Sequence, residues 1–395
     1  MIFEYIDVDN SRKGISLDKV HNADSSWKTV DGENKLEFIK NFFAYYDTNQ
    51  KMVLFDKNHK QLVDFYEKND IDSFDEIKEV NENSKILFFT SGSSGFPLGA
   101  FKSRENLQKE VKALAILLEN SKMKKVVVTV PFVHIYGILA GLLLPRYLDD
   151  ITLVVKDEFL PYELINEALE GDTLFITTPV FIKALLRVQD STKLKNSLFI
   201  SSTAPLESSD AKEFESKFDT KLLQLFGSTE TGGIAYKVGD STIWKALLDV
   251  KLSQNDDKLN VNSPYISKYT IKDKIKKLDA GFQTEDIIEI DGDSFKLLGR
   301  SNKIIKIAGK RISSMQIETI LEQIYGVKRA IVTLVYKKDM FKSEQIKITL
   351  ESIREIKKAE IKESINNNFG TLSIPFSVSY VEKINYSAMG KKVIF

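Results

Sequence analysis

From residue 85 onward the sequence alternates between short runs of β-branched and aromatic residues and longer segments with helical spacing. The run KILFF (85–89) predicts a buried strand, and residues 104–122 after it predict a helix with Ser103 as its cap. The apolar residues at helical spacing in that segment are Leu107, Val111, Leu114 and Leu118. The run KKVVVTV (124–130) suits a strand covered on both faces. This alternation predicts an α/β domain with mainly parallel sheets.

The pattern changes after Gly233. The segment DIIEIDGDSFKLLGR (286–300) predicts a hairpin with its turn at Asp291-Gly292. Beyond it, strand patterns alternate with helices expected near residues 315–325 and 357–368. We therefore expect a large α/β domain with a β-rich subdomain, residues 1–301, and a small α+β C-terminal domain, residues 302–395.

Composition disfavours several classes of protein. Lys plus Arg and Asp plus Glu both number 56, so the formal net charge is zero and gives no attraction to nucleic acid. The sequence has no cysteine, which excludes disulfides and fits a reducing compartment, and its three histidines are too scattered for a zinc site. The N-terminus carries acids where a signal peptide is basic, and no apolar run reaches ~20 residues. We expect a cytoplasmic protein without a membrane span.

Residues 90–99, TSGSSGFPLG, combine three glycines with several hydroxyl side chains. Glycine lets the backbone approach a ligand closely, and exposed N–H and hydroxyl groups suit phosphate oxygens. A loop after a strand and before a helix is a typical phosphate site of α/β proteins. The residues do not fit a Walker loop, a G-x-G-x-x-G turn or a G-x-S-x-G elbow. Taken alone, they are also compatible with a flexible surface loop.

TSGSSGFPLG closely resembles TSG[ST]TGxPKG, the phosphate-binding signature of the adenylate-forming (AMP-binding) superfamily, which includes acyl-CoA synthetases, peptide-synthetase adenylation domains and luciferases. Further blocks resemble the family in the same order. They are SSTAPL (201–206) for SGGAPL, LFGSTETGG (225–233) for YGxTE, residues 282–313 for TGD…DG…GRxDxxIKxxGxRI, and SAMGKK (387–392) for TxxGK. The chain thus resembles an acyl-CoA synthetase or aryl-CoA ligase that is N-terminally shortened.

The resemblance implies a reaction in two steps. A carboxylate attacks the α-phosphate of ATP, giving an acyl-adenylate and pyrophosphate, and a phosphopantetheine thiol of CoA or an acyl carrier protein then takes the acyl group. It implies ATP and Mg²⁺ as cofactors. The ATP-binding residues that it implies are Thr90, Ser91, Gly92, Ser93, Ser94, Gly95, Ala204, Pro205, Phe226, Gly227, Ser228, Thr229, Asp286 and Arg300. Turn hydrogen bonds are the alternative role for the serines, and a structural ion pair is the alternative for Arg300.

Two charged residues match catalytic positions of the family. The lysine in the place of Lys391 bridges the carboxylate and the α-phosphate, a task that suits a point charge on a flexible stem. The glutamate in the place of Glu230 binds Mg²⁺, which favours hard carboxylate oxygens, although an acid at a helix start is the alternative. The resemblance also implies that the C-terminal domain is mobile, with a hinge at Asn302 and a thiol tunnel at Ala308 and Gly309.

Residues 131–144, PFVHIYGILAGLLL, resemble the family segment that lines the acyl pocket. His134 stands where acyl- and aryl-CoA ligases often carry an aromatic residue or histidine, and we include it among the catalytic residues. Together with Ile135, Phe181 and Gly232 it is expected to line an apolar slot for an aryl or fatty acid. The segment lacks the aspartate that amino-acid-activating relatives use. For each apolar residue an ordinary core position is the alternative.

Leu98 departs from the family, because the phosphate loop normally carries lysine there. A leucine cannot neutralise pyrophosphate, and Lys102 is the nearest cation in the sequence that we expect to compensate in part. This departure keeps open a second class of protein, a non-catalytic adenylate-binding relative with a degenerate phosphate loop. The short N-terminal part leaves the acyl pocket either more open or completed by a partner chain.

Overall fold

A computed structural model describes most of the chain in two compact units. The described residues are 2–7, 10–17, 23–32, 34–57, 62–64, 80, 83–90, 98–119, 121–148, 150–272, 274–278, 281–301, 304–307, 310–336, 344–369, 375–386 and 392–393. The first unit comprises residues 1–252, 260–282 and 292–294, and the second comprises residues 253–259, 283–291 and 295–395. The second unit therefore includes residues that precede 302, and the domain boundary at that residue stays a prediction.

The larger sheet of the first unit is mainly parallel. Its strands follow the order β13 (Ile243–Ala246), β12 (Gly232–Val238), β11 (Lys221–Ser228), β10 (Ser197–Ser201), β9 (Thr173–Thr177), β7 (Lys125–Val128), β8 (Thr152–Val155), β1 (Ile2–Ile6) and β2 (Arg12–Gly14). Neighbours from β11 to β1 are parallel, whereas β12, β13 and β2 join the ends as antiparallel strands. The alternation seen in the sequence therefore gives the predicted parallel sheet.

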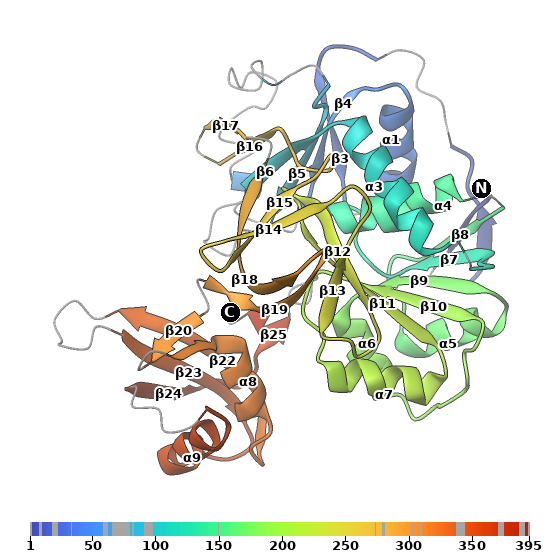
Figure 1. Ribbon diagram of the computed structural model, residues 1–395. Coiled ribbons are helices and arrows are strands. Elements are labelled where there is room, and N and C mark those ends of the chain that lie inside the picture. The colour runs from blue at the N-terminus through green and yellow to red at the C-terminus, as the bar shows by residue number, and fades with distance from the viewer. Residues whose placement is uncertain are drawn as a thin grey trace. The chain divides into compact units, whose positions relative to one another are not determined.

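Helices cover both faces of this sheet (Figure 1). On one face α5 (Pro161–Leu169), α6 (Pro179–Leu186) and α7 (Ser208–Phe218) pack on the strands through residues such as Leu164, Ile182 and Phe214. On the other face a π-helix, η2 (Gly137–Leu143), packs on β7 and β9, and α3 (Arg104–Leu117) and α4 (Leu144–Tyr147) pack on it. Burial on both faces explains why β7 carries valine at three successive positions.

A second sheet of the first unit follows the order β17 (Ile275–Lys277), β16 (Tyr269–Ile271), β6 (Leu98–Lys102), β5 (Ile86–Thr90), β4 (Lys51–Phe55) and β3 (Trp27–Asp31). The strands β3, β4 and β5 are parallel, and the others are antiparallel to their neighbours. The helix α1 (Lys35–Asp47) packs on β3. Asn34 caps this helix, because its side-chain oxygen accepts a hydrogen bond of 3.0 Å from the backbone amide of Glu37. The predicted helix after Ser103 is confirmed, because the Asn106 amide donates to the Ser103 hydroxyl at 3.0 Å.

One local prediction was wrong. The loop after Thr90 was expected to lie between a strand and a helix, but it joins β5 to β6, and Thr90 pairs with Leu98 across this antiparallel hairpin. Strand β6 reads LGAFK, and its small residues give no strand pattern in the sequence. Gly99 is needed in this strand, because a Cβ there would lie 2.5 Å from the Ile271 side chain of β16.

The second unit is built on a three-stranded sheet in which β23 (Glu344–Ser352) lies between antiparallel β22 (Val327–Tyr336) and parallel β24 (Phe376–Tyr380). The helices α8 (Ser314–Glu322) and α9 (Lys358–Phe369) complete its core. Both helices occur where they were predicted. The other strands of this unit are β20 (Ile304–Ile307) with β21 (Lys310–Ser313) and β25 (Asn385–Tyr386) with β26 (Lys392–Val393). Four further strands have residues of both units and follow the order β14 (Lys251–Asn255), β15 (Lys258–Asn262), β18 (Phe282–Asp291) and β19 (Ser294–Arg300).

The hairpin of β18 and β19 is confirmed, and Gly292 in its turn has a φ of +58°. The predicted fold class is confirmed as well: a large α/β domain with mainly parallel sheets and β-rich additions, and a smaller α+β part. The mobility of the C-terminal domain stays a prediction.

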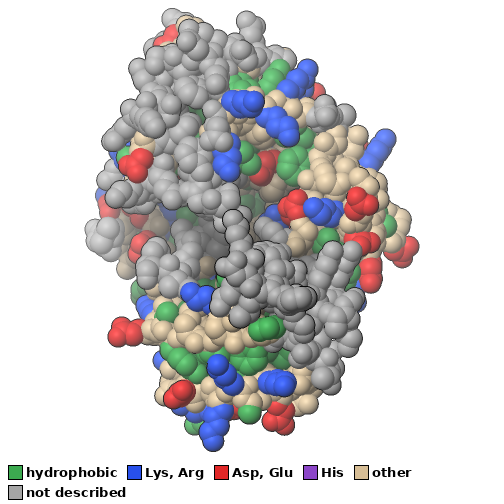
Figure 2. Space-filling view, turned by 90° about the vertical axis from the view of Figure 1, so that its left-hand side faces the viewer, with side chains coloured by type: hydrophobic (Ala, Val, Ile, Leu, Met, Phe, Trp, Pro, Cys, Tyr) green, Lys and Arg blue, Asp and Glu red, His purple; other side chains and the backbone are tan. Residues whose placement is uncertain are grey.

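Charged side chains of both signs lie on the face shown in Figure 2. On the described part of the face in Figure 2, acidic and basic side chains alternate without a field of one sign. Within the described residues no helix has the length and apolar character needed to cross a membrane. The cytoplasmic location stays a prediction.

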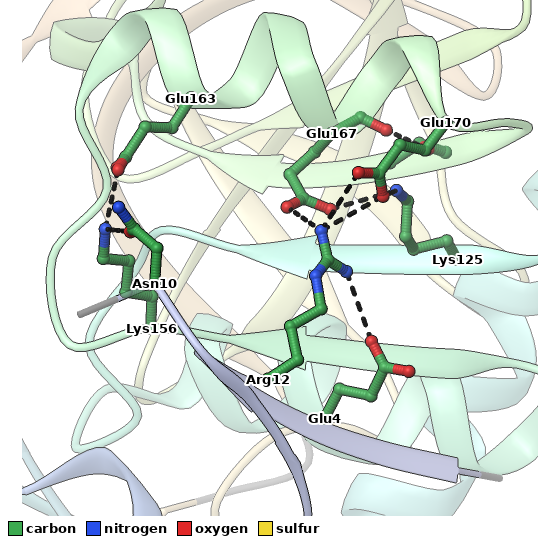
Figure 3. A network of polar contacts seen from close by, with 9 residues as sticks. Glu4, Asn10, Arg12, Lys125, Lys156, Glu163, Glu167 and Glu170 are labelled. Atoms are coloured by element: carbon green, nitrogen blue, oxygen red, sulfur yellow. Dashed lines mark hydrogen bonds and ion pairs between the residues drawn. The ribbon is translucent and has the colours of Figure 1, made fainter. Parts of the chain in front are cut away.

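A network of charged residues holds the N-terminal hairpin of β1 and β2 (Figure 3). The Arg12 guanidinium donates to Glu167 at 2.6 Å, to Glu170 at 3.1 Å and to Glu4 at 3.3 Å. Lys125 of β7 donates to the same Glu167 and Glu170 carboxylates at 3.0 and 3.1 Å. These contacts tie β2 to α5 and β7.

Candidate active site

Several candidate residues follow the carboxyl ends of parallel strands. Because these ends meet at one edge of a sheet, the segments after β7, β9, β10 and β11 lie along that edge, where α/β proteins commonly bind ligands. The buried Tyr136 hydroxyl lies 3.1 Å from the Thr177 carbonyl and 2.8 Å from the Ile200 carbonyl, at the ends of β9 and β10. This contact brings the segment of His134 and Ile135 to the same edge.

The segment LFGSTETGG forms the end of β11, a tight turn and the start of β12. Gly227 pairs with Gly233 and Ser228 with Gly232, and the register shifts between Phe226 and Gly227. The hydroxyls of Ser228 and Thr231 lie 3.0 Å apart and close the turn. We call residues 228–233 the Glu230 loop. Ser228 makes a turn hydrogen bond there, which is the alternative role expected for the serines.

Two fully buried charges lie behind the Glu230 loop. Lys102, the last residue of β6, donates its ammonium hydrogens to the carbonyls of Glu230, at 3.2 Å, and of Tyr265. Glu110 of α3 accepts a hydrogen bond from the Gly233 amide at 2.5 Å. The Glu230 carbonyl also accepts from the Ser267 amide at 2.8 Å. The centre and one end of the loop are therefore held by groups of the same unit.

Burial shifts the pKa of both groups in the direction that favours the neutral form. Loss of solvation lowers the pKa of Lys102 to about 8, against the attraction of Glu110 and Glu230. Loss of solvation raises the pKa of Glu110 to about 7, against the attraction of Lys102 and the hydrogen bond from Gly233. Lys102 is thus no surface cation. The expectation that it compensates for Leu98 was wrong, because its ammonium is fully buried against backbone carbonyls.

The residues expected beside adenine lie on two adjoining segments. Ala204 and Pro205 follow β10, and the Ser202 hydroxyl ties that segment to the Leu225 carbonyl at 2.9 Å. The half-buried Phe226 ring has its centroid 5.3 Å from that of Trp244 on β13. The ammonium of Lys237 lies 4.9 Å from the centre of the Trp244 ring. No sequence pattern indicates Trp244, because only the strand order places it beside Phe226.

The residues expected in the acyl pocket have different surroundings. His134 and Ile135 are half-buried, and the Ile138 amide donates to the His134 carbonyl at 3.2 Å where the helical segment begins. Phe181 on α6 packs against the core between the helices and the sheet, which fits its alternative role as a core residue. Gly232 is buried with a φ of +71°, and a Cβ there would lie 2.5 Å from a carboxylate oxygen of Glu110.

Asp286 and Arg300 both belong to the second unit and form an ion pair, with 3.6 Å between the Arg300 Nε and an Asp286 oxygen. Burial raises the pKa of Asp286, although Arg300 and the contact with Thr284 favour its charged form. The ion pair corresponds to the structural alternative for Arg300. It also orients a largely buried carboxylate, so a role in binding a ribose stays a proposal.

The other predicted site residues lie outside the described residues. They are Ser91, Gly92, Ser93, Ser94, Gly95, Asn302, Ala308, Gly309 and Lys391, together with the side chain of Thr90. The described residues next to them in the sequence include Thr90 and Leu98, which flank residues 91–97, and Lys392 in β26.

Glu230 supplies a half-buried carboxylate on a turn whose backbone is fixed. Mg²⁺ usually binds proteins through one or two carboxylates plus the phosphates of a nucleotide, so a single residue of this kind fits an ion that binds together with ATP.

The fold and the Glu230 loop define a member of a known family. The model of the family described as AMP-binding enzyme matches residues 23–259, which is more than half of the chain, so the chain belongs to this family. The expected membership in the adenylate-forming superfamily is therefore confirmed.

Individual relatives agree with this assignment. A 2-succinylbenzoate–CoA ligase of Listeria monocytogenes is 24% identical over an alignment of 323 residues that covers 77% of this chain and 68% of the relative. The ATP-bound structure of MatB from Rhodopseudomonas palustris superimposes with a TM-score of 0.77 at 17% identity, covering 94% of this chain and 87% of that one. The o-succinylbenzoate-CoA synthetase of Bacillus subtilis, solved with its acyl-adenylate intermediate, gives a TM-score of 0.78 at 16% identity with the same coverage.

Proposed function

We propose that the chain activates a carboxylic acid with ATP and transfers the acyl group to a thiol. The carboxylate oxygen attacks the α-phosphorus, the bond to the β-phosphate breaks, and pyrophosphate leaves. The sulfur of a phosphopantetheine thiol then attacks the acyl carbon, the acyl–oxygen bond breaks, and AMP leaves. The observation that carries this proposal is the Glu230 loop, a family signature that lies at the carboxyl edge of the parallel sheet.

Each part of the nucleotide has proposed partners. Residues 90–95 and Thr229 bind phosphates, and Ala204, Pro205 and Phe226 lie beside adenine. Glu230 holds Mg²⁺, which supplies charge neutralisation on the phosphates when it is bound. Asp286 accepts hydrogen bonds from the ribose, and Arg300 contacts ribose and phosphate.

The substrate and the acceptor are proposed at the level of chemical class. His134, Ile135 and Gly232 suit an apolar aryl or fatty acid, with Phe181 at the rim of the core. The acceptor is the phosphopantetheine of CoA or of an acyl carrier protein. Residues 302–395 rotate at Asn302 between the two steps, so that Ala308 and Gly309 reach the thiol in the second step.

Pyrophosphate exchange tests the proposal. Labelled pyrophosphate is incubated with the chain, ATP, Mg²⁺ and a panel of aryl, short-chain and long-chain acids. We expect label in ATP only when an accepted acid is present, because the first step is then reversible. Exchange without an acid, or ATP hydrolysis to ADP and phosphate, would contradict acid activation.

Lys391 provides a second test. Lys391→Ala should abolish exchange and still allow transfer from a preformed acyl-adenylate, because the lysine acts only in the first step. Equal loss of both half-reactions would contradict this role. A conservative Lys391→Arg variant keeps the charge and controls for its simple loss.

Leu98 favours a second candidate function, a non-catalytic adenylate-binding protein. The half-buried leucine begins β6, and the buried Lys102 does not replace the missing cation. This alternative predicts ATP binding without exchange for every acid. Leu98→Lys should then create or increase exchange, whereas an unchanged rate in the variant would show that position 98 does not limit the first step.

A further inference from the structure

The Glu230 loop is held by one buried cation and one buried anion. Lys102 binds the carbonyl at its centre, that of Glu230, and Glu110 binds the amide of Gly233 at its end. Both side chains come from the two elements that follow residues 91–97 in the sequence, β6 and α3. Neither charged group is accessible to a ligand, since Lys102 is 0% and Glu110 is 3% exposed.

A buried pair of charges usually adds little to the stability of a fold. Removing two charges from water is costly, and apolar residues of similar volume often stabilise a protein equally well or better. Here each charge makes a directed contact with the backbone of the same loop. Lys102 also holds the Tyr265 carbonyl, so that residues 230 and 265 are fixed to a single ammonium group.

We propose that Lys102 and Glu110 are positioning residues that fix the Glu230 loop so that the Glu230 carboxylate meets the Mg²⁺ of a bound nucleotide. This inference rests on the proposed function. Gly232 fits the same arrangement, because its positive φ and the nearness of Glu110 leave no room for a side chain. The pair thus holds the backbone of the loop, whose Thr229 and Glu230 side chains are half-buried.

Two variants test whether Lys102 and Glu110 position the loop, and both avoid leaving an isolated buried charge. Glu110→Asp keeps the negative charge and withdraws the acceptor from the Gly233 amide. The double variant Lys102→Met and Glu110→Gln removes both charges together, so that no isolated charge is buried. Glu167→Gln is the matched control, because Glu167 is also a buried carboxylate that holds cations, but at the β1–β2 end of the sheet.

Affinity for ATP, and for Mg²⁺ at fixed ATP, is measured by calorimetry on folded protein. We expect both test variants to bind ATP·Mg²⁺ about tenfold more weakly and to need more Mg²⁺, with Glu167→Gln unchanged. In a Glu230→Gln background, Glu110→Asp should add little, because the two residues then act through one contact. Additive effects in this cycle would overturn the inference.

Other outcomes of these measurements distinguish failure of the inference from failure of the proposed function. Wild-type affinity in both test variants, or equal loss in Glu167→Gln, would overturn the inference while leaving the proposed function intact. Binding of ATP by wild type without exchange for any acid would overturn the proposed function. The ATP affinities of the variants would still show whether Lys102 and Glu110 position the Glu230 loop. If Glu110→Asp does not fold, the double variant decides. If neither folds, the pair serves the fold and the inference is overturned.

Discussion

Arg12 and Lys102 are both cations that hold several oxygen atoms in the first unit, but their surroundings differ. The Arg12 side chain is 35% exposed and its partners are side-chain carboxylates, whereas Lys102 is fully buried and its partners are backbone carbonyls. After removal of Arg12, the Glu167 and Glu170 carboxylates still accept hydrogen bonds from Lys125. Removing Lys102 takes a donor from two buried carbonyls, of which that of Glu230 keeps the Ser267 amide, and a buried carbonyl that loses its donor is costly.

The comparison separates two uses of charge. The Arg12 network (Figure 3) joins elements that the strand order already brings together, so its contribution is a modest addition to packing. The Lys102–Glu110 pair instead adds contacts to a turn between β11 and β12, whose ladder pairs Ser228 with Gly232. A partly exposed cation therefore adds to stability here, whereas the fully buried pair acts on the geometry of one loop.

Glu110→Ala should cause the largest loss of stability. It leaves the Lys102 ammonium buried without its anion and the Gly233 amide without its acceptor, so we expect the free energy of unfolding to fall by about 3–5 kcal/mol. Glu167→Ala, at the edge network, should cost about 1–2 kcal/mol. Urea denaturation of the three proteins measures both values, and equal losses would remove the distinction between the two clusters.

Gly232→Ala should follow, at about 2–4 kcal/mol. The new Cβ would lie 2.5 Å from a Glu110 oxygen and 2.8 Å from the Tyr265 Cβ, at a φ of +71°. Gly292→Ala is the matched control, because its φ of +58° is similar and nothing lies within 4 Å of a Cβ there. The control should cost only ~1 kcal/mol. Similar losses for both would mean that backbone strain, and not the Glu110 contact, limits position 232.

The pH dependence of stability should differ in sign between the clusters. Folded Glu110 keeps its proton to about pH 7 instead of 4.5, so the free energy of unfolding falls as pH rises through that window. Folded Lys102 loses its proton near pH 8 instead of 10.5, so the free energy rises again above pH 8. Wild type should therefore be least stable, relative to the Lys102→Met and Glu110→Gln double variant, between these values.

The edge network predicts a different window. Burial alone would raise the pKa of Glu170, but Lys125 and Arg12 lower it below its ordinary value. Its contribution is therefore present above about pH 4.5 and is lost below it. Unfolding free energies are measured near pH 3.5, 5, 7.5 and 9.5 for wild type and for the variants of the buried pair and of the edge network. The sign of the pH dependence is then compared between the two clusters, with slopes of at most ~1.4 kcal/mol per pH unit and group. A flat difference curve for the double variant would contradict the buried pair.

Arg12→Met should have the smallest effect, about 1 kcal/mol at low salt, and less at 1 M salt because exposed pairs are screened. The difference between wild type and the double variant at Lys102 and Glu110 should not respond to salt, since water and ions do not reach the pair. Denaturation at low and high ionic strength distinguishes the cases. A strong salt response at Lys102 would indicate that the pair is hydrated.

Much of the fold follows from local patterns in the sequence, as α3 shows. Its cap at Ser103 and its stripe of Leu107, Val111 and Leu114 predict both its start and its buried face. The same stripe contains a signal that was missed, because Glu110 lies three residues after Leu107 and four before Leu114, on the apolar face. A charge in such a stripe needs a buried partner.

The partners of that charge were not predictable, because they come from distant segments. Lys102 was expected to compensate in part for Leu98, but it is buried against carbonyls of residues 230 and 265 that only the folded unit brings near. Trp244 reaches Phe226 for the same reason, through the order of β11, β12 and β13. The signature blocks indicated which segments matter, whereas the contacts behind them depend on tertiary structure.

The central claim, acid activation through an adenylate, is tested most directly by looking for the intermediate. The chain is mixed with ATP, Mg²⁺ and an accepted acid without any thiol, quenched, and analysed by mass spectrometry. We predict one acyl-adenylate per active chain in wild type, none in Lys391→Ala, and an undiminished amount in Glu167→Gln. An acid-dependent product other than the acyl-adenylate, or ADP in place of AMP and pyrophosphate, would contradict the account.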